Sequence, residues 1–435
     1  MPSAPQRSRL VDRSPVFYGW VVLALGTLGM VMTTPGQTLG VSVFLDPILD
    51  DLQAERGTVS LLYTLGTLAG AVALPFVGRA LDRWGPRVMV AVVSAGLALA
   101  CVWMANVRDL WMLAIGFVLI RGLGQGALGL VSVHAITIWF VRRRGLAIGL
   151  AGVGMAAATA FFPLLIETMV AAWGWRWAYV ALGGLVAVTI LPLGALFFRR
   201  DPERYGVTPD ARSPLPPPPP GREEVHLSAS QARQTVAFWY IAASVATISA
   251  LSTGLVFHHF DLMGVRGMDR LAAAGVFVPM ALVSAATNVG AGLLLDRVAP
   301  RFVISGMLVA MAASLIGATL VAEPTLWLYG GVLGLTQGAM GAVSGTAYAS
   351  YFGRRAIGGI KGTAQTLSVG GAAAGPLLFA WGHDASGTYG PVLIGAALWP
   401  LALAVGALFI RRPKRAEGVD GNPTVTVHTK TPPSS

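Results

Sequence analysis

The stretch LGQGALGLVSVHAITIWFVRR (residues 123–143) returns 212 residues later as LTQGAMGAVSGTAYASYFGRR (residues 335–355), with 11 of 21 positions identical. A second shared phrase, Gly-x-x-x-Asp-Arg-x-x-x-Arg, occurs as GRALDRWGPR (78–87) and GLLLDRVAPR (292–301). A third matched block contains Pro163 and Pro376 and keeps the same order along the chain. A repeat of about half the chain's length predicts that the protein is built from two copies of one unit.

The composition places both units in a membrane. Of the 435 residues, 54% are hydrophobic and 12% are charged, whereas soluble domains carry about 25% charged residues. The net charge of +11 does not indicate a nucleic-acid partner, because the basic residues lie in short breaks between long apolar stretches. We therefore predict an integral membrane protein embedded in the lipid bilayer, and its single cysteine, Cys101, excludes an intrachain disulfide.

Apolar windows long enough to cross about 30 Å of hydrocarbon predict the membrane-spanning helices. These windows lie near residues 17–44, 57–79, 88–106, 111–136, 145–169, 176–198, 236–260, 270–294, 302–321, 326–351, 357–381 and 390–410. Twelve spans, six in each repeat, predict an all-α membrane protein of two six-helix bundles. A half-length repeat with an even number of spans relates the bundles by a pseudo-two-fold axis along the membrane normal.

The polar breaks predict the orientation and the domain boundaries. With the N-terminus inside, 25 of the 31 Lys and Arg residues fall in cytoplasmic segments and five in external loops, so both termini are expected in the cytoplasm, at the inner (plasma) membrane. We expect an N-terminal segment (1–16), a first bundle (17–198), a Pro-rich linker (199–235), a second bundle (236–410) and a disordered tail (411–435).

Two features of the linker have structural consequences. PLPPPPPG (214–221) predicts a semi-rigid polyproline II spacer. Ser228 and Gln231 have the spacing of a capping box, which predicts a short helix before span seven.

The two loop phrases place acidic side chains beside the cytoplasmic ends of other spans. Spans five and eleven begin at that face, and the free N–H groups of a helix N-terminus attract an anion. We expect Asp82 to cap span eleven near Lys361, and Asp296 to cap span five near Arg144, when the cytoplasmic side is closed. The arginines of the same expected gate are Arg83, Arg87, Arg297 and Arg301. The alternative is that all of these are positive-inside loop charges without a gating role.

A single charge lies deep within a predicted span. Arg121 is about 11 residues into span four, where a charge is costly and must face protein or water. It either binds an anionic substrate together with Gln125, one turn away, or holds neighbouring spans together through hydrogen bonds. Other candidates for lining a cavity between the bundles are Thr34, Gln37, Asn288 and Gln337. Threonine hydroxyls often bond back to their own helix instead.

The chain resembles the major facilitator superfamily over about residues 17–410. The two loop phrases carry the resemblance, together with Arg121, Gln125 and Gly126, which depart by one residue from the family's arginine-x-x-glutamine-glycine pattern. FYGWVV (17–22), PGQTLGVSVF (35–44) and RRDPERYGVTPD (199–210) are similar to bacterial monocarboxylate transporters and oxalate/formate antiporters. The resemblance implies a secondary transporter, without a cofactor and expected to be a monomer, that moves a small organic anion by alternating access. It leaves coupling to protons open.

Several alternatives stay open or are disfavoured. Span eight holds no charge between residues 271 and 295, where carboxylate-carrying relatives place an arginine, so a neutral or amphipathic substrate exported by efflux is an alternative. No nucleophile, base and acid gather at one depth, and no metal-ligand spacing occurs, which argues against an enzyme and against a metal site. A membrane sensor that has lost transport would carry an appended soluble domain, for which the linker and tail are short.

Overall fold

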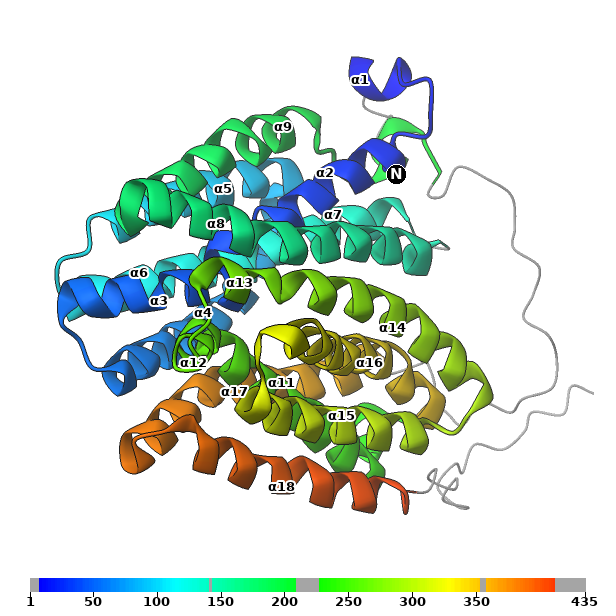
Figure 1. The fold of residues 1–435 in the computed structure, drawn as a ribbon. Helices are drawn as coiled ribbons and strands as arrows, with labels where there is room; N and C mark the ends of the chain where they lie inside the picture. The colour runs from blue at the N-terminus through cyan, green and yellow to red at the C-terminus, as the bar shows by residue number, and fades with distance from the viewer. Residues whose placement is uncertain (1–7, 141–142, 209–226, 353–356, 411–435) are drawn as a thin grey trace, which may run out of the picture.

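The computed structural model describes residues 8–140, 143–208, 227–352 and 357–410, and the regular structure in these ranges is helical (Figure 1). The first half contains α1 (Arg9–Asp12), α2 (Gly19–Val31), the 3-10 turn η1 (Thr34–Gly36), α3 (Thr38–Leu52), α4 (Arg56–Trp84), α5 (Pro86–Ala105), α6 (Leu110–Ile120), the π-helical segment η2 (Arg121–Leu128), α7 (Gly129–Trp139), α8 (Arg144–Val188) and α9 (Ile190–Phe197). The first span is α2, η1 and α3 in series, and the fourth is α6, η2 and α7.

The linker and the second half follow the same pattern. The described linker residues form η3 (Pro202–Tyr205) and α10 (Ala229–Arg233). The second half contains α11 (Val236–Phe257), α12 (His259–Gly264), α13 (Arg270–Gly275), α14 (Phe277–Arg297), α15 (Pro300–Leu320), η5 (Glu323–Thr325), α16 (Leu326–Phe352), α17 (Ile357–Ser386) and α18 (Tyr389–Ala407).

All twelve predicted spans correspond to helices. By length and composition, nine helical segments among the described residues can cross a membrane. One of these, 52 residues from Leu146 to Phe197, contains spans five and six, because Gly174 has a φ of 78° and interrupts the helix between them. Spans ten and eleven, α16 and α17, have 27 and 30 residues, which suffices for about 30 Å at 1.5 Å per residue, but glycine and hydroxyl residues make them less apolar.

The two halves repeat the same helix pairings. In the first half α2 packs against α7 and α8, and α5 packs against α9; in the second half α11 packs against α16 and α17, and α15 against α18. We call α2–α9 the N-terminal bundle and α11–α18 the C-terminal bundle; in Figure 1 most of the first lies above the second. The fold is therefore two six-helix bundles related by a pseudo-two-fold axis, as the repeat predicts.

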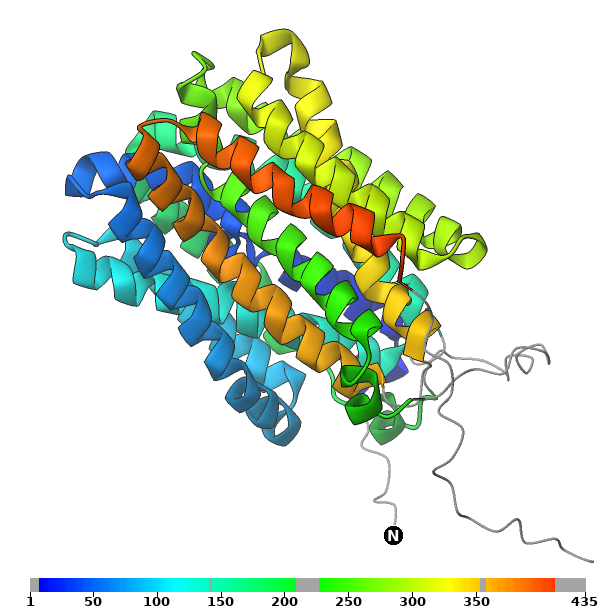
Figure 2. The ribbon, with the colours of Figure 1, turned by 90° about the horizontal axis from the view of Figure 1, so that it is seen from below.

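Contacts between α4 and α17, between α8 and α14, and between α3 and α11 join the bundles. Figure 2 shows α17 (orange) between α4 (blue) and α11 (green). The Thr64 hydroxyl donates to the carbonyl of Ala373 at 2.7 Å, and the rings of Tyr63 and Phe257 lie 4.4 Å apart. Polar and aromatic contacts thus connect the second span to the other bundle.

Glycines allow a close approach of two helices, α14 and α16, within the C-terminal bundle. Gly330, Gly334 and Gly338 recur every four residues along α16. A Cβ atom at these positions would meet the backbone carbonyls of Val276, just before α14, and of Met280 and Ser284 in α14, respectively. Small residues at this spacing let helix backbones pack closely in lipid, so α14 and α16 form one rigid wall.

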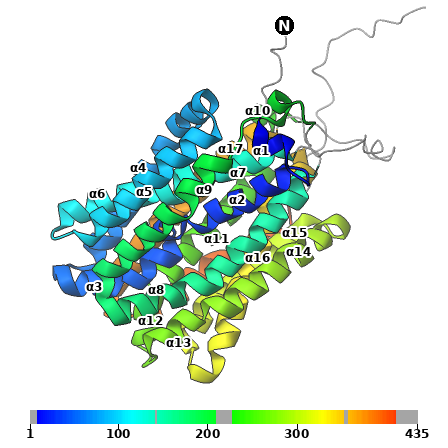
Figure 3. The same ribbon diagram turned by 90° about the horizontal axis from the view of Figure 1, so that it is seen from above.

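The two ends of the bundles differ. Figure 3 shows α1 and α10 at one end, which we call the linker face; the distal face is the opposite end, where α3, α12 and α13 lie. The predicted capping box is confirmed, because the Ser228 hydroxyl accepts from Gln231 N–H at 3.2 Å and the Gln231 Oε1 accepts from Ser228 N–H at 2.9 Å. The polyproline segment (214–221) and the tail (411–435) lie outside the described residues, and the domain boundaries stay predictions.

Candidate functional site

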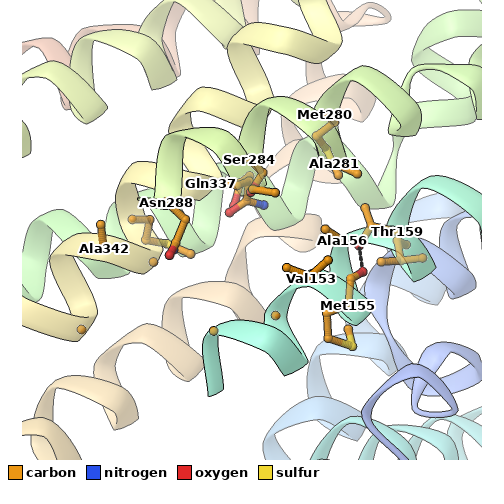
Figure 4. Close-up of a pocket in the computed structure, with 18 of the residues that line it drawn as sticks. Val153, Met155, Ala156, Thr159, Met280, Ala281, Ser284, Asn288, Gln337 and Ala342 are labelled. Atoms are coloured by element: carbon orange, nitrogen blue, oxygen red, sulfur yellow. Dashed lines mark hydrogen bonds between the residues drawn. The ribbon is translucent and has the colours of Figure 1, made fainter. Parts of the chain in front are cut away.

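A cavity of about 810 Å³ lies between the two bundles. Its walls come from α3, η2 and α8 of the N-terminal bundle and from α11, α14 and α16 of the C-terminal bundle. Figure 4 shows Met155 and Thr159 on one wall facing Ser284, Asn288 and Gln337 on the other. Ligand pockets in proteins have volumes of about 300–1,000 Å³, so this space can hold a small molecule.

The lining combines apolar and polar side chains and, among the described residues, carries no charge. The polar lining residues are four amides and six hydroxyl residues. The amides are Gln37, Gln125, Asn288 and Gln337, and the hydroxyl residues are Thr38, Thr159, Ser252, Thr253, Ser284 and Thr346. Between them lie Met155, Met280 and Met340, whose flexible thioethers adapt to irregular apolar shapes. Such a lining suits a ligand that has both hydrogen-bonding groups and an apolar body.

Four of the six residues that the sequence suggested for the substrate site are these amides. Gln37 follows the break in the first span with extended backbone (ψ 151°), and its Nε2 donates to Thr33 Oγ1 at 3.0 Å. Asn288 Nδ2 donates to the carbonyl of Gly338 at 3.3 Å. The side chains of Gln125 and Gln337 have no hydrogen-bond partner among the described residues, so both amides are free for a ligand.

The other two, Thr34 and Arg121, are buried and do not line the cavity. Thr34 Oγ1 donates to the carbonyl of Val31 at 2.6 Å, as a hydroxyl that bonds back to its own helix does. The Arg121 guanidinium donates through Nε to Thr67 Oγ1 at 2.9 Å and through Nη1 to the carbonyl of Gly36 at 2.8 Å. It also lies 4.6 Å from the centre of the Tyr63 ring.

Arg121 thus connects the fourth span to the first two. Its third nitrogen, Nη2, makes no hydrogen bond to a described residue. Gln125, in the same π-helical segment, lines the cavity. The guanidinium therefore lies just behind the wall, and its role toward a substrate stays a prediction.

Irregular backbone brings Gly36 and Arg121 together. A Cβ atom on Gly36 would meet the carbonyl of Ile120, and one on Gly124 would lie 3.1 Å from Gly36 Cα. The backbones of the first and fourth spans therefore meet through glycine. The break after η1 frees the carbonyl of Gly36, which Arg121 then satisfies, and π-helical segments such as η2 frequently occur at functional sites.

Among the predicted gate residues whose side chains the structure describes, no hydrogen bond or ion pair bridges the bundles. Asp82 is exposed and has no ion pair or hydrogen bond to a described residue. Arg87 Nε donates to the carbonyl of Ala195 at 2.6 Å, and Lys361 Nζ to that of Gly345 at 2.8 Å. Each of these contacts stays within one bundle.

The remaining gate residues also face their own bundle or solvent. The carbonyl of Arg83 accepts from Arg200 Nη2 at 3.0 Å, Arg301 lies 4.9 Å from the centre of the Phe302 ring, and Arg297 is exposed. The side chain of Asp296 is outside what the structure describes. The contacts expected for a closed linker side stay predictions.

Charged residues that the sequence analysis did not assign to any site join the bundles at the distal face. Arg270 pairs with Asp46 and Glu167 at 2.9 and 3.0 Å, and Arg56 pairs with Asp46 and Asp261 at 2.9 and 3.0 Å. In the sequence, these ion pairs are indicated only by the presence of acidic and basic residues at the distal ends of the spans. The partners across the interface could not be predicted, because Arg56 and Asp261, and Arg270 with Asp46 and Glu167, are far apart in the chain.

The cavity, in contrast, continues toward the linker face. Its lining includes Ile148, one turn from the start of α8, and Thr346, six residues before the end of α16. The bundles are thus joined at the distal face and separated by the cavity toward the linker face.

The fold and the cavity are those of a multi-pass membrane protein with a central space between two helical bundles. Residues 21–330 match the Major Facilitator Superfamily, and the chain belongs to this family, so it is not an enzyme. Human monocarboxylate transporter 6 is 31% identical over 217 residues, 48% of this chain and 40% of that protein. Mouse monocarboxylate transporter 14 is 26% identical over 223 residues, 51% of this chain and 43% of that protein. The likeness to monocarboxylate transporters is therefore confirmed, although it spans about two fifths of these relatives.

A solved structure shares the fold. The crystal structure of a bacterial homolog of the human lysosomal transporter Spinster, in an inward-facing and occupied conformation, matches with a TM-score of 0.66 and 16% identity. The match covers 90% of this chain and 95% of that chain.

Proposed function

We propose that this protein is a secondary transporter that moves organic monocarboxylates by alternating access. The bundles, residues 17–198 and 236–410, rock about the central cavity, and the protein acts as a monomer. The observation that supports this proposal is the cavity between the bundles. It has an amide without a hydrogen-bond partner among the described residues on each wall, and Arg121 lies behind Gln125. The names of the relatives, monocarboxylate transporters 6 and 14, support a carboxylate cargo. The linker face is cytoplasmic under the positive-inside rule, with the protein in the inner membrane.

The cavity offers both halves of a monocarboxylate a partner. A carboxylate that leaves water needs charge compensation and hydrogen-bond donors. The amide groups of Gln125 and Gln337 supply donors from opposite walls, and the buried charge of Arg121 acts over a short distance in a medium of low dielectric constant. The methionines of the lining contact the apolar body of the acid.

A neutral or amphipathic cargo is the second candidate. Two observations favour it: the described lining residues carry no charge, and about 810 Å³ is far more than a small acid fills. This cargo would use the same amides as donors and acceptors, and Arg121 would then be a purely structural group.

A matched pair of ligands separates the two candidates. Phenylacetate and phenylacetamide have nearly the same shape, and a ligand that binds the folded state raises the melting temperature of the purified protein. We expect stabilisation by phenylacetate and not by the amide. Equal stabilisation by both ligands, or stabilisation by phenylacetamide alone, would contradict an anionic cargo and support a neutral one.

Uptake into proteoliposomes tests transport itself. We expect labelled lactate, formate or phenylacetate to accumulate, and unlabelled phenylacetate to compete while phenylacetamide does not. Uptake measured with and without an imposed pH gradient tests whether a proton accompanies the acid. Protein that moves none of these acids would contradict the proposal.

A further inference from the structure

One aromatic side chain contacts Arg121, the cavity lining and the other bundle. Tyr63 lies in the second turn of α4 and is fully buried. The guanidinium carbon of Arg121 lies 4.6 Å from the centre of the Tyr63 ring. The Tyr63 hydroxyl lies 2.8 Å from that of Thr38, which lines the cavity. The centre of the ring also lies 4.4 Å from that of Phe257 in the C-terminal bundle, so Tyr63 connects the buried cation to the interface between the bundles.

The ring and two hydrogen bonds fix the orientation of the guanidinium. Arg121 Nε donates to Thr67 Oγ1, and Arg121 Nη1 donates to the carbonyl of Gly36. The Thr67 hydroxyl in turn donates to the carbonyl of Tyr63 at 2.9 Å, so the ring and this acceptor lie one turn apart on α4. The face of an aromatic ring attracts a guanidinium most strongly where water is excluded. Tyr63 and Thr67 therefore hold Arg121 in one orientation behind the cavity wall.

The C-terminal bundle packs on the same ring. Phe257 ends α11 and is fully buried, and its neighbour Val256 lines the cavity. The residue after Tyr63, Thr64, donates to the carbonyl of Ala373 in α17. Because Tyr63 and Phe257 belong to different bundles, a rocking motion of the bundles changes the contact between the two rings.

A second aromatic contact of Tyr63 comes from its own bundle. Phe117 of α6 is fully buried, and the centre of its ring lies 5.6 Å from that of Tyr63, with the ring planes at 85°. Phe117 is not among the residues that line the cavity. It therefore provides a matched comparison for Phe257, because the same type of side chain meets the same ring from within the N-terminal bundle.

We propose that Tyr63 is a positioning residue, which orients Arg121 for a bound carboxylate and couples the occupancy of that site to the packing of the two bundles. The inference rests on the proposed function, in which Arg121 compensates the charge of the cargo. A carboxylate near the guanidinium competes with the ring for the same positive charge. Binding therefore weakens the attraction between Arg121 and Tyr63. A ligand can shift the bundles only through contacts that differ between their two arrangements, and the contact between Tyr63 and Phe257 is such a contact.

Substitutions of Tyr63 test the ring itself. Tyr63→Leu removes the aromatic face, whereas Tyr63→Phe keeps the face and removes only the hydroxyl. In proteoliposome uptake of phenylacetate, we expect Tyr63→Leu to raise KM by about 10- to 30-fold, which corresponds to the loss of a cation–π contact shielded from water. Tyr63→Phe should change KM by less than about threefold, because the cation–π contact remains. A purely structural ring would affect the melting temperature and leave KM unchanged in the folded variant.

Phe257→Leu separates the coupling from the positioning. It leaves Tyr63 against Arg121 but removes the aromatic contact across the interface. We expect kcat for phenylacetate to fall by at least about threefold while KM stays within about twofold of the wild-type value. Phe117→Leu is the matched control, because it should lower the melting temperature and keep both kinetic constants.

The kinetic constants decide between these roles. A wild-type KM in folded Tyr63→Leu would overturn the positioning role, and so would an equally large rise of KM in Tyr63→Phe or Phe117→Leu. A wild-type kcat in Phe257→Leu would overturn the coupling. Should Tyr63→Leu fail to fold, Phe257→Leu still tests the proposal.

Melting temperatures without ligand separate this inference from the proposed cargo. The wild type, Tyr63→Leu, Arg121→Gln and the double variant form a double-mutant cycle. We expect the double variant to lose less than the sum of the two single losses, because each substitution removes the same contact. Additive losses would overturn the positioning of Arg121 by Tyr63, whatever the cargo. Failure of carboxylate uptake in a protein that shows this non-additivity would overturn the cargo and leave Tyr63 as the residue that orients Arg121.

Discussion

Arg121 Nη1 donates a hydrogen bond to the carbonyl oxygen of Gly36 at 2.8 Å, which joins the π-helical segment of the fourth span to the break in the first. A second bond, from Nε to Thr67, adds the second span. Three helices of the N-terminal bundle therefore meet at one buried side chain directly behind the cavity. Substitutions of Arg121 must be measured for stability and for transport together.

Arg121→Gln and Arg121→Lys separate these two roles. Hydrogen bonds to charged groups contribute about 1.5–3 kcal/mol each, so we expect both variants to melt at a lower temperature, Gln more than Lys. Carboxylate uptake should fall by more than about tenfold in folded Arg121→Lys, because an ammonium group cannot reproduce the planar guanidinium. Melting temperature and proteoliposome uptake are compared for the three proteins. Folded Arg121→Gln with undiminished uptake would show that Arg121 is purely structural.

Gln337→Leu should weaken substrate binding with little effect on folding. The Gln337 amide lines the cavity and has no hydrogen-bond partner among the described residues. Loss of one hydrogen bond of about 0.5–1.5 kcal/mol raises KM by about 2- to 10-fold. Thr34→Val is the comparison, because the Thr34 hydroxyl bonds to Val31 away from the cavity. Equal effects of both variants on KM would argue against Gln337 as a substrate contact.

Asp82→Asn should change the balance of conformations. When the linker side closes, Asp82 is expected to face the N-terminus of α17 near Lys361, an interaction of about 0.3–2 kcal/mol. Its loss should lower the population with a closed linker face by about 2- to 30-fold, as measured by spin-label distances across that face. Asp201→Asn is the control, because Asp201 pairs with Arg204 inside the linker at 3.6 Å. Unchanged distances in Asp82→Asn would leave the loop phrase without a gating role.

Gly334→Ala should destabilise the C-terminal bundle. A Cβ at Gly334 would meet the carbonyl of Met280 on α14, whereas a Cβ at Gly345, on the same helix, would meet nothing within 4 Å. We expect a loss of about 1–3 kcal/mol for Gly334→Ala and a neutral effect or a gain of up to about 1 kcal/mol for Gly345→Ala. The melting temperatures of the two variants, compared with that of the wild type, test this expectation. Equal values would mean that the close approach of α14 and α16 does not depend on Gly334.

The number of spans, their division into two bundles and the four cavity amides were predictable from the residues alone. Hydrophobic length depends only on neighbouring residues, and the repeat of residues 123–143 at 335–355 is visible without coordinates. Gln37, Asn288 and Gln337 were predictable because a buried amide that faces lipid is costly. Gln125 was predicted from its place one turn after Arg121.

The directions of Thr34 and Arg121 were decided by the tertiary structure. A 3.6-residue period assumes a regular α-helix, but Thr34 lies in a 3-10 turn and Arg121 begins a π-helical segment, so neither side chain follows the expected face. The contact of Gly36 with Gly124 then makes Arg121 a partner of the first span.

The ion pairs between the bundles at the distal face depend on the fold, because they join residues as far apart as Asp46 and Arg270. Local sequence records that these charges lie near the ends of spans. Which carboxylate faces which arginine is set by how the two six-helix bundles pack against each other. The apolar pattern of the helices does not specify that packing, because it is similar in the two repeats. The amino-acid pattern therefore determined the bundles, and their tertiary contact decided how the distal face is closed.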